Sequence, residues 1–121
     1  MALSTLKKRA EFLRVRNGRR WSNSAFVLET QSRPKRAKCP TEARFGFTVS
    51  KKIGSAVVRN RVRRRLRALV AALDPAQVRP GNDYVLIVRP GAVERTYRDL
   101  KADLDQALAR VHQPVATKSR N

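Results

Sequence analysis

With 121 residues, the chain is long enough for one domain with a single hydrophobic core. Its 28 basic and 9 acidic residues give a net charge of +19, which favours a polyanionic partner such as nucleic acid, an anionic membrane or an acidic protein. No apolar run reaches the ~18 residues of a spanning helix or forms a signal peptide, and the single cysteine, Cys39, excludes an internal disulfide. We therefore expect a cytoplasmic protein with no membrane partner.

A basic helix is expected at the start of the chain. The spacing of Leu6, Ala10 and Leu13 predicts a helix over residues 4–17 with these three side chains on its buried stripe. Phe12 falls off this stripe, which indicates that its ring faces a groove.

Two strands are expected next, over residues 24–30 and 44–50. They could pair as an antiparallel hairpin. The segment between them, 31–43, has no periodicity and several basic residues, which predicts a long basic loop. A further short strand is expected near residues 51–57.

The second half of the chain has the clearer elements. A helical period from residue 57 to 73 is followed by a continuously apolar strand at 83–89, and a capped helix begins at Thr96. We expect a single domain over residues 1–113 and a flexible tail at 114–121.

The element order is therefore helix, strand, strand, an optional short strand, helix, strand and helix. This order predicts an α+β fold, with a small, mostly antiparallel four-stranded sheet packed against three helices.

The helix around Arg59-Asn60-Arg61 has the strongest functional pattern. No acidic residue stands between Ala43 and Leu73. One third of the helix circumference is apolar, and the opposite side is formed by Asn60, Arg63, Arg64 and Arg67, with Arg59, Arg61 and Arg65 on its flanks. Solvated helix faces usually mix charges of both signs, so an arginine ridge without counter-charges indicates binding to a phosphate backbone.

The kind of nucleic acid is less clear from these patterns. A strand is expected on each side of the basic helix, which disfavours a helix–turn–helix DNA reader. Aromatic residues on the sheet could stack on single-stranded RNA bases or pack in the core, and packing is the favoured role for each: Phe26, Phe45, Phe47 and Tyr84.

No catalytic or metal-binding residues are predicted. The sequence has no pair of a nucleophile and a base. Asp99 and Asp103 share a helix face at a spacing that could hold Mg²⁺, but Arg95 and Lys101 beside them favour surface ion pairs. The single histidine, His112, lies near a helix end, where the helix dipole favours it.

The basic segment resembles a known signature, that of the bacterial ribonuclease P protein subunit: Lys-Lys-x-Gly-x-Ala-x-x-Arg-Asn-x-x-Lys/Arg-Arg. It reads here Lys51-Lys52-Ile53-Gly54-Ser55-Ala56-Val57-Val58-Arg59-Asn60-Arg61-Val62-Arg63-Arg64-Arg65-Leu66-Arg67. The resemblance extends to Glu11-Phe12, Phe26-Val27-Leu28, the run from Arg44 to Ser50, Asp83-Tyr84-Val85 and Thr96-Tyr97. Only the loop at 31–43 and the residues from 113 onward fall outside it.

The resemblance implies a fold and a function. The fold would be like one domain of a small-subunit ribosomal protein, with a left-handed βαβ crossover. The chain would be the protein subunit of a ribonucleoprotein endonuclease that removes the 5′ leader from precursor tRNA. Its partners would be the catalytic RNA and precursor tRNA, with no other protein subunit required. The RNA would carry the active site and its Mg²⁺, so the protein itself would bind no cofactor.

The resemblance also implies site residues. Those expected to bind the RNA subunit are Lys51, Lys52, Arg59, Asn60, Arg61, Arg63, Arg64 and Arg67. Those expected to line a cleft for the leader are Phe12, Arg16, Val27 and Tyr84. Arg16 stands where the family often has an aromatic residue, and Glu29 stands where it often has tyrosine. The alternative function is that of a non-catalytic, structural RNA-binding protein of the ribosomal type.

Overall fold

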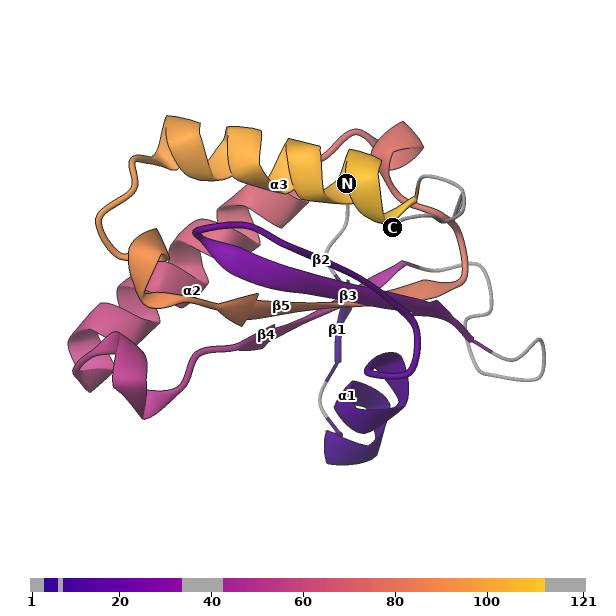
Figure 1. The fold of residues 1–121 in the computed structure, drawn as a ribbon, viewed down its shortest axis with the longest axis horizontal. Helices are drawn as coiled ribbons and strands as arrows, with labels where there is room; N and C mark the ends of the chain where they lie inside the picture. Colours follow the sequence, from indigo (N-terminus) through magenta and orange to yellow (C-terminus); the bar gives the residue numbers. More distant parts are fainter. Residues whose placement is uncertain (1–3, 7, 34–42, 113–121) are drawn as a thin grey trace.

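The computed structural model describes residues 4–6, 8–33 and 43–112, which form one β-sheet with helices on both faces (Figure 1). In chain order the elements are β1 (Ser4–Thr5), α1 (Arg9–Val15), β2 (Arg19–Ser22), β3 (Phe26–Ser32), β4 (Arg44–Thr48), the 3-10 helix η1 (Lys51–Ile53), α2 (Ala56–Ala71), η2 (Pro75–Gln77), β5 (Asn82–Val88), η3 (Pro90–Ala92) and α3 (Tyr97–Val111). The predicted α+β class is confirmed. The predicted tail, 114–121, and residues 34–42 of the predicted loop lie outside the described residues.

The sheet has the strand order β1-β4-β5-β3-β2. β5 lies in the middle, parallel to β4 and antiparallel to β3, so the predicted β3–β4 hairpin is wrong. The reason is that β5 is apolar on both faces, and such a strand is most stable between two neighbours. β1 is parallel to β4 and β2 is antiparallel to β3, which makes the sheet mixed. α2 connects the parallel neighbours β4 and β5, and the left-handed crossover implied there stays a prediction.

The N-terminal segment differs from the predicted helix over 4–17. Its first residues extend the sheet as β1, so Leu6 lies before α1 and not within it. The shorter helix buries Val15 completely and half-buries Phe12, whereas Leu13 is 39% exposed. The predicted apolar stripe of this helix is therefore wrong. The predicted strand near residues 51–57 is also wrong, because η1 and the start of α2 occupy that segment.

Two hydrophobic clusters lie on opposite faces of the sheet. Figure 1 shows α2 and α3 on one side of the sheet and α1 on the other. The larger one packs α2 and α3 against the sheet, and its fully buried aromatic side chains are Phe26, Phe45 and Tyr84. The favoured core role of these three residues is thus confirmed. The smaller cluster joins α1 to the other face through Val15 and Val85. No helix in the described ranges is long and apolar enough to cross a membrane.

His112, at the C-terminal end of α3, has a specific partner that the sequence did not reveal. Its Nε2 lies 2.7 Å from the Tyr84 hydroxyl, which accepts a hydrogen bond from the Arg79 N–H at 2.8 Å. Since burial raises the pKa of Tyr84, the hydroxyl stays protonated and shares a hydrogen bond with His112 Nε2. Burial, together with the charges of Arg79 and Arg19, lowers the pKa of His112 to about 4. The histidine is therefore neutral at pH 7, and the predicted charge–dipole role is wrong.

This neutral histidine makes folding stability depend on pH. An unfolded histidine titrates near 6.5, so the unfolded chain binds the proton more tightly than the folded chain does. We expect the free energy of unfolding to fall as the pH drops from 6.5 to about 4. Because the ring is only partly buried and solvent screens its charge, this group contributes less than the roughly 3 kcal/mol that the full shift would give. Urea unfolding at several pH values should show a flatter profile over this range for His112→Gln. An unchanged profile in the variant would contradict the assignment.

Candidate nucleic-acid interface

Two residues set the start of α2. Gly54 has a φ of 151°, a positive value that residues with side chains rarely adopt, and a Cβ there would lie 3.1 Å from Val58 Cγ1. Ser55 caps the helix, because its Oγ accepts a hydrogen bond from the Val58 N–H at 3.3 Å. Lys51 and Lys52 are exposed in η1 immediately before this cap. The lysine pair therefore extends the basic surface beyond the N-terminus of α2.

The orientation of α2 agrees with its helical wheel. The apolar stripe is buried against the sheet and α3 through Val62, Leu66, Leu69 and Val70. These contacts fix the rotation of the helix about its axis, so the opposite side faces solvent. The exposed basic side is thus a consequence of core packing.

We call this side the cationic ridge, and it consists of Asn60, Arg63, Arg64 and Arg67. Its side chains and that of Val57 line an open hollow of about 520 Å³ on the surface. Arg63 Nη1 donates a hydrogen bond to Asn60 Oδ1 at 3.1 Å, which orders two members of the ridge. The predicted residues on this side are therefore brought together in one concave surface.

The flanking arginines differ in their surroundings. Arg61 is exposed, whereas Arg59 is half-buried and its Nε has no hydrogen-bond partner among the described residues. Arg65 Nη1 donates to the Arg95 carbonyl at 3.1 Å, so this side chain holds the loop before α3. Arg65 is thus partly structural, and Arg61 extends the basic surface sideways.

The charge of the cationic ridge is not neutralised within the described residues. No carboxylate there lies within ion-pair distance of any arginine of α2. The like charges repel one another at helical spacing, and a bound polyanion would relieve this repulsion. Guanidinium groups match phosphate oxygens with two parallel hydrogen bonds. The ridge is therefore chemically suited to a nucleic-acid backbone.

A second concave surface lies on the other face of the sheet, beside α1. We call it the α1 cleft; it has a volume of about 360 Å³ and is lined by Arg16, Arg20, Glu29 and Ile87. Val27 pairs with Ile87 across β3 and β5, so both side chains point to this face. Phe12 lies one helical turn before Arg16 and packs against the same small cluster as Ile87.

Phe12 is seated against the backbone of β4. A Cβ at Gly46 would lie 2.6 Å from the Phe12 ring atoms Cε2 and Cζ, so the ring occupies the space that a side chain there would need. Three of the four residues expected to line a cleft, Phe12, Arg16 and Val27, are thus on one face of the sheet.

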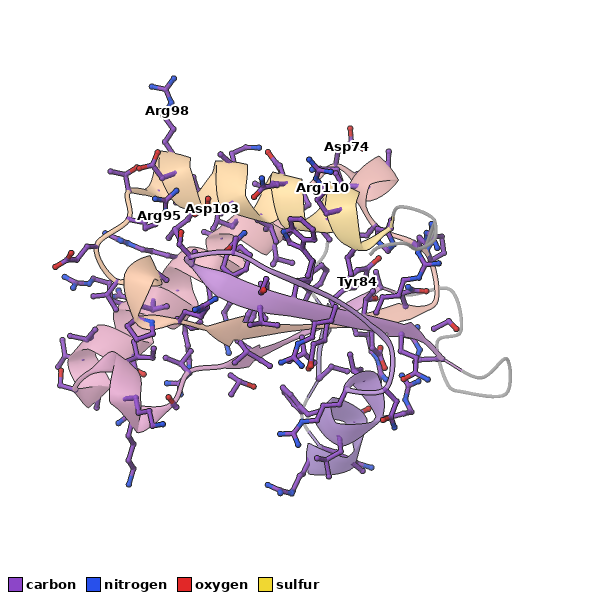
Figure 2. The ribbon with its side chains drawn as sticks, in the orientation of Figure 1. Asp74, Tyr84, Arg95, Arg98, Asp103 and Arg110 are labelled. Atoms are coloured by element: carbon purple, nitrogen blue, oxygen red, sulfur yellow. The ribbon has the colours of Figure 1, made fainter. Side chains whose placement is uncertain are left out.

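Tyr84 does not belong to the α1 cleft, and this is a correction. Its side chain is fully buried on the opposite face, toward α3 (Figure 2), and its ring stacks on Phe45 with centroids 4.8 Å apart. Side chains alternate between the two faces of a strand, so its neighbours Val85 and Ile87 point toward α1 instead. Ile87 is the β5 residue that lines the cleft.

Sequence reasoning missed a buried charged group that fixes α1 to the sheet. The Asp83 side chain has no exposure and accepts hydrogen bonds from three arginines: from Arg14 at 2.6 Å, from Arg33 at 2.5 Å and from Arg44 at 2.9 and 3.0 Å. Arg44 also forms an ion pair with Glu11 of α1 at 2.9 Å. Arg33 falls within the predicted basic loop, yet its side chain is buried. One sequence signal was available: an acidic residue in an otherwise apolar strand.

In the acidic pair considered for Mg²⁺, the Asp103 carboxylate is bound by an arginine. Arg95 donates two hydrogen bonds to the Asp103 carboxylate, at 2.7 and 2.9 Å (Figure 2). The backbone N–H of Asp99 donates a hydrogen bond to Thr96 Oγ1, and this bond caps α3. Across the described ranges, no group of three or more His, Cys, Asp or Glu side chains is placed to hold a metal ion.

Comparisons with known proteins identify a family for the chain. The family model described as Ribonuclease P matches residues 2–112. The ribonuclease P protein component of Paramagnetospirillum magneticum is 47% identical over 110 residues, covering 90% of this chain and 83% of that protein. The same component of Ruegeria pomeroyi is 42% identical, covering 93% of this chain and 89% of that protein.

Solved structures have the same fold. The RNase P protein of Staphylococcus aureus superposes with a TM-score of 0.75 at 29% identity, over 93% of this chain and all of that one. The RNase P protein from Thermotoga maritima has a similar fold, with a TM-score of 0.76 at 23% identity, over 91% of this chain and 99% of that one. With the family match and the close relatives, these similarities show that the chain belongs to the family of bacterial ribonuclease P protein components, the protein subunits of that ribonuclease.

Proposed function

We propose that the chain binds the catalytic RNA of ribonuclease P through the cationic ridge and binds the single-stranded 5′ leader of precursor tRNA in the α1 cleft. In this way it assists the endonucleolytic removal of the leader, which gives the mature tRNA 5′ end. The RNA subunit carries the active site and its Mg²⁺, and the protein contributes binding and positioning in the bacterial cytoplasm. No other protein subunit is needed for this role.

One observation carries the proposal: two concave surfaces with different chemistry lie on different elements of the same small domain. The hollow on the cationic ridge is lined by three arginines, Asn60 and Val57, which is 77% exposed, and no acidic side chain lines it. Such a surface is suited to the phosphates of a folded RNA, where the bases are paired and stacked inside. Lys51, Lys52, Arg59 and Arg61 extend it along η1 and α2.

The α1 cleft is suited to single-stranded RNA. Unpaired bases bind on apolar and aromatic surfaces while basic side chains follow the backbone. The cleft has one apolar lining residue, Ile87, and the cations Arg16 and Arg20 at its sides. Val27 and Phe12 lie on the same face of the sheet, next to Ile87. A single-stranded leader that leaves the tRNA near the RNA active site would meet both requirements.

Reconstitution with a bacterial ribonuclease P RNA tests the proposal. We expect the purified full chain to stimulate cleavage of precursor tRNA at low Mg²⁺, where the RNA alone is nearly inactive. We also expect the affinity of the holoenzyme for precursor tRNA to fall as the leader is shortened stepwise. Absence of stimulation would overturn the proposal. RNA binding without any dependence on leader length would favour the alternative, a structural RNA-binding protein of the ribosomal type.

A further inference from the structure

Glu29 is an unusual side chain for a surface that binds RNA. It is 3% exposed and lines the α1 cleft from β3. Among the described residues its one ionic partner is Arg20, whose Nε lies 3.8 Å from Glu29 Oε2, beyond hydrogen-bond distance. An ionised carboxylate has about four acceptor positions, and burying it without hydrogen bonds costs free energy. Glu29 therefore has free acceptor capacity at the wall of an open cavity.

The surroundings of Glu29 restrict which chemical group could use that capacity. A phosphate would be repelled by the carboxylate, and the nearby Arg16 and Arg20 offer it a better site. A planar group with N–H donors at its edge satisfies the carboxylate, while its face packs on Ile87. The cavity volume of about 360 Å³ is within the usual range for small-ligand pockets. A nucleobase with its amino edge toward Glu29 has these properties.

We propose that Glu29 is a specificity-determining residue that selects the leader base entering the α1 cleft; this inference rests on the proposed leader-binding function. Guanine presents two adjacent donors, N1–H and N2–H, that match the two carboxylate oxygens. Cytosine and adenine each present one exocyclic amine, which a carboxylate also accepts. Uracil has a single N–H between two carbonyl oxygens that repel the carboxylate, so uracil is disfavoured.

The expected discrimination is substantial because the carboxylate is buried. A site built to form hydrogen bonds rejects a ligand that lacks the matching groups, since its own polar atoms are then left unpaired. A good contact between a side chain and a base edge discriminates by roughly tenfold or more. We therefore expect guanine to bind at least about tenfold more tightly than uracil at one leader position.

The experiment uses the reconstituted holoenzyme and precursor tRNAs that differ by one leader nucleotide at each position in turn. The dissociation constant is measured for the wild type, for Glu29→Gln and for the control Glu94→Gln. Glu94 is exposed, so its variant matches the charge change away from the cleft. We expect one position with guanine favoured over uracil in the wild type and in the control. The preference should disappear in Glu29→Gln, because an amide both donates and accepts.

A change in the RNA tests the same contact if the Glu29→Gln variant does not fold. Inosine in place of guanine removes only the N2 amine, so it should weaken binding to the wild type at the same position. Base-independent binding at every position, or a preference that Glu29→Gln retains, would overturn the assignment of Glu29. Affinity that does not change with leader length would instead overturn the proposed function itself, so the two failures are distinguishable.

Discussion

Asp83→Asn should destabilise the folded chain by about 3–5 kcal/mol, which is the usual cost of removing one partner from a buried charge pair. The carboxylate has no exposure, and the side chain of Arg33 beside it is only 2% exposed. Without the Asp83 carboxylate, the buried Arg33 guanidinium and Arg14 would each lose an ion pair, and Arg44 would keep only its pair with Glu11. Domains of this size have a total stability of about 5–15 kcal/mol. A large part of it would therefore be lost.

The same network predicts an acid-sensitive component of stability. Burial by itself raises the pKa of the Asp83 carboxyl, but the hydrogen bonds from Arg44, Arg33 and Arg14 together lower it below its usual value of 3.8. Because the folded-state pKa is lowered, the stabilisation is complete above pH 3.8 and is lost as the pH falls through the folded-state value. The pH range in which Asp83 loses its stabilising effect lies below most of the pH range in which His112 loses its own. Unfolding measured at a series of pH values can therefore distinguish the two groups.

Urea unfolding of Asp83→Asn and of Asp99→Asn would test this expectation. Asp99 is exposed in the first turn of α3, where a carboxylate usually contributes no more than about 1 kcal/mol. If the Asp83 variant were as stable as the Asp99 variant, the arginine cluster would not be what fixes α1 to the sheet. The α1 cleft should also widen or become disordered in the Asp83 variant, because α1 forms one of its walls.

The success of sequence reasoning depended on how local each feature is. The cationic ridge and the buried stripe of α2 both follow from spacing within sixteen residues, so they could be predicted. The buried side of α1 could not, because a helix of seven residues carries too few positions to define a stripe. The surface of the sheet against which α1 packs decides which side of α1 is buried. β1 places Leu6 on the sheet, and the backbone of Gly46 leaves room for Phe12.

Tyr84 and Asp83 show two further limits. From Tyr84 to Val88 the strand β5 has no polar residue, so no alternation tells which side chain points to which face, and a shift of one residue exchanges the faces. The resemblance placed Tyr84 in the cleft, and no alternation in this strand contradicted that placement, although Val85 and Ile87 point there. The arginines around Asp83 come from α1, the end of β3 and β4, between 39 and 69 residues away in the chain, and no local pattern marks such a cluster.

Arg64→Glu combined with Arg67→Glu should have the largest effect on RNA binding. Each arginine of the cationic ridge can form charge-assisted hydrogen bonds to a phosphate, worth about 1.5–3 kcal/mol. Removing two of them should weaken binding to the RNA subunit at least roughly a hundredfold, since 1.4 kcal/mol corresponds to tenfold. Both side chains are exposed and without an ion-pair partner among the described residues, so the melting temperature should remain nearly unchanged.

The salt dependence of binding distinguishes a lost contact from a lost fold. A protein that neutralises about six phosphates should show a log–log slope of roughly −4 to −5, from about 0.7–0.9 per contact. The double variant should reduce the magnitude of this slope by roughly 1.4–1.8, because two contacts are removed. A variant that is merely misfolded would lose affinity together with its cooperative thermal transition.

Arg98→Glu with Arg110→Glu is the matched control, because it makes the same change in net charge on α3 (Figure 2). Both side chains are exposed, and Arg110 has a single aromatic neighbour, Trp21, at 5.6 Å from the ring centroid. If binding depended only on total charge, the two double variants would weaken it equally. We expect the α3 variant to lose much less affinity, because the shape and spacing of the α2 arginines, more than the +19 charge of the whole chain, determine where the RNA binds.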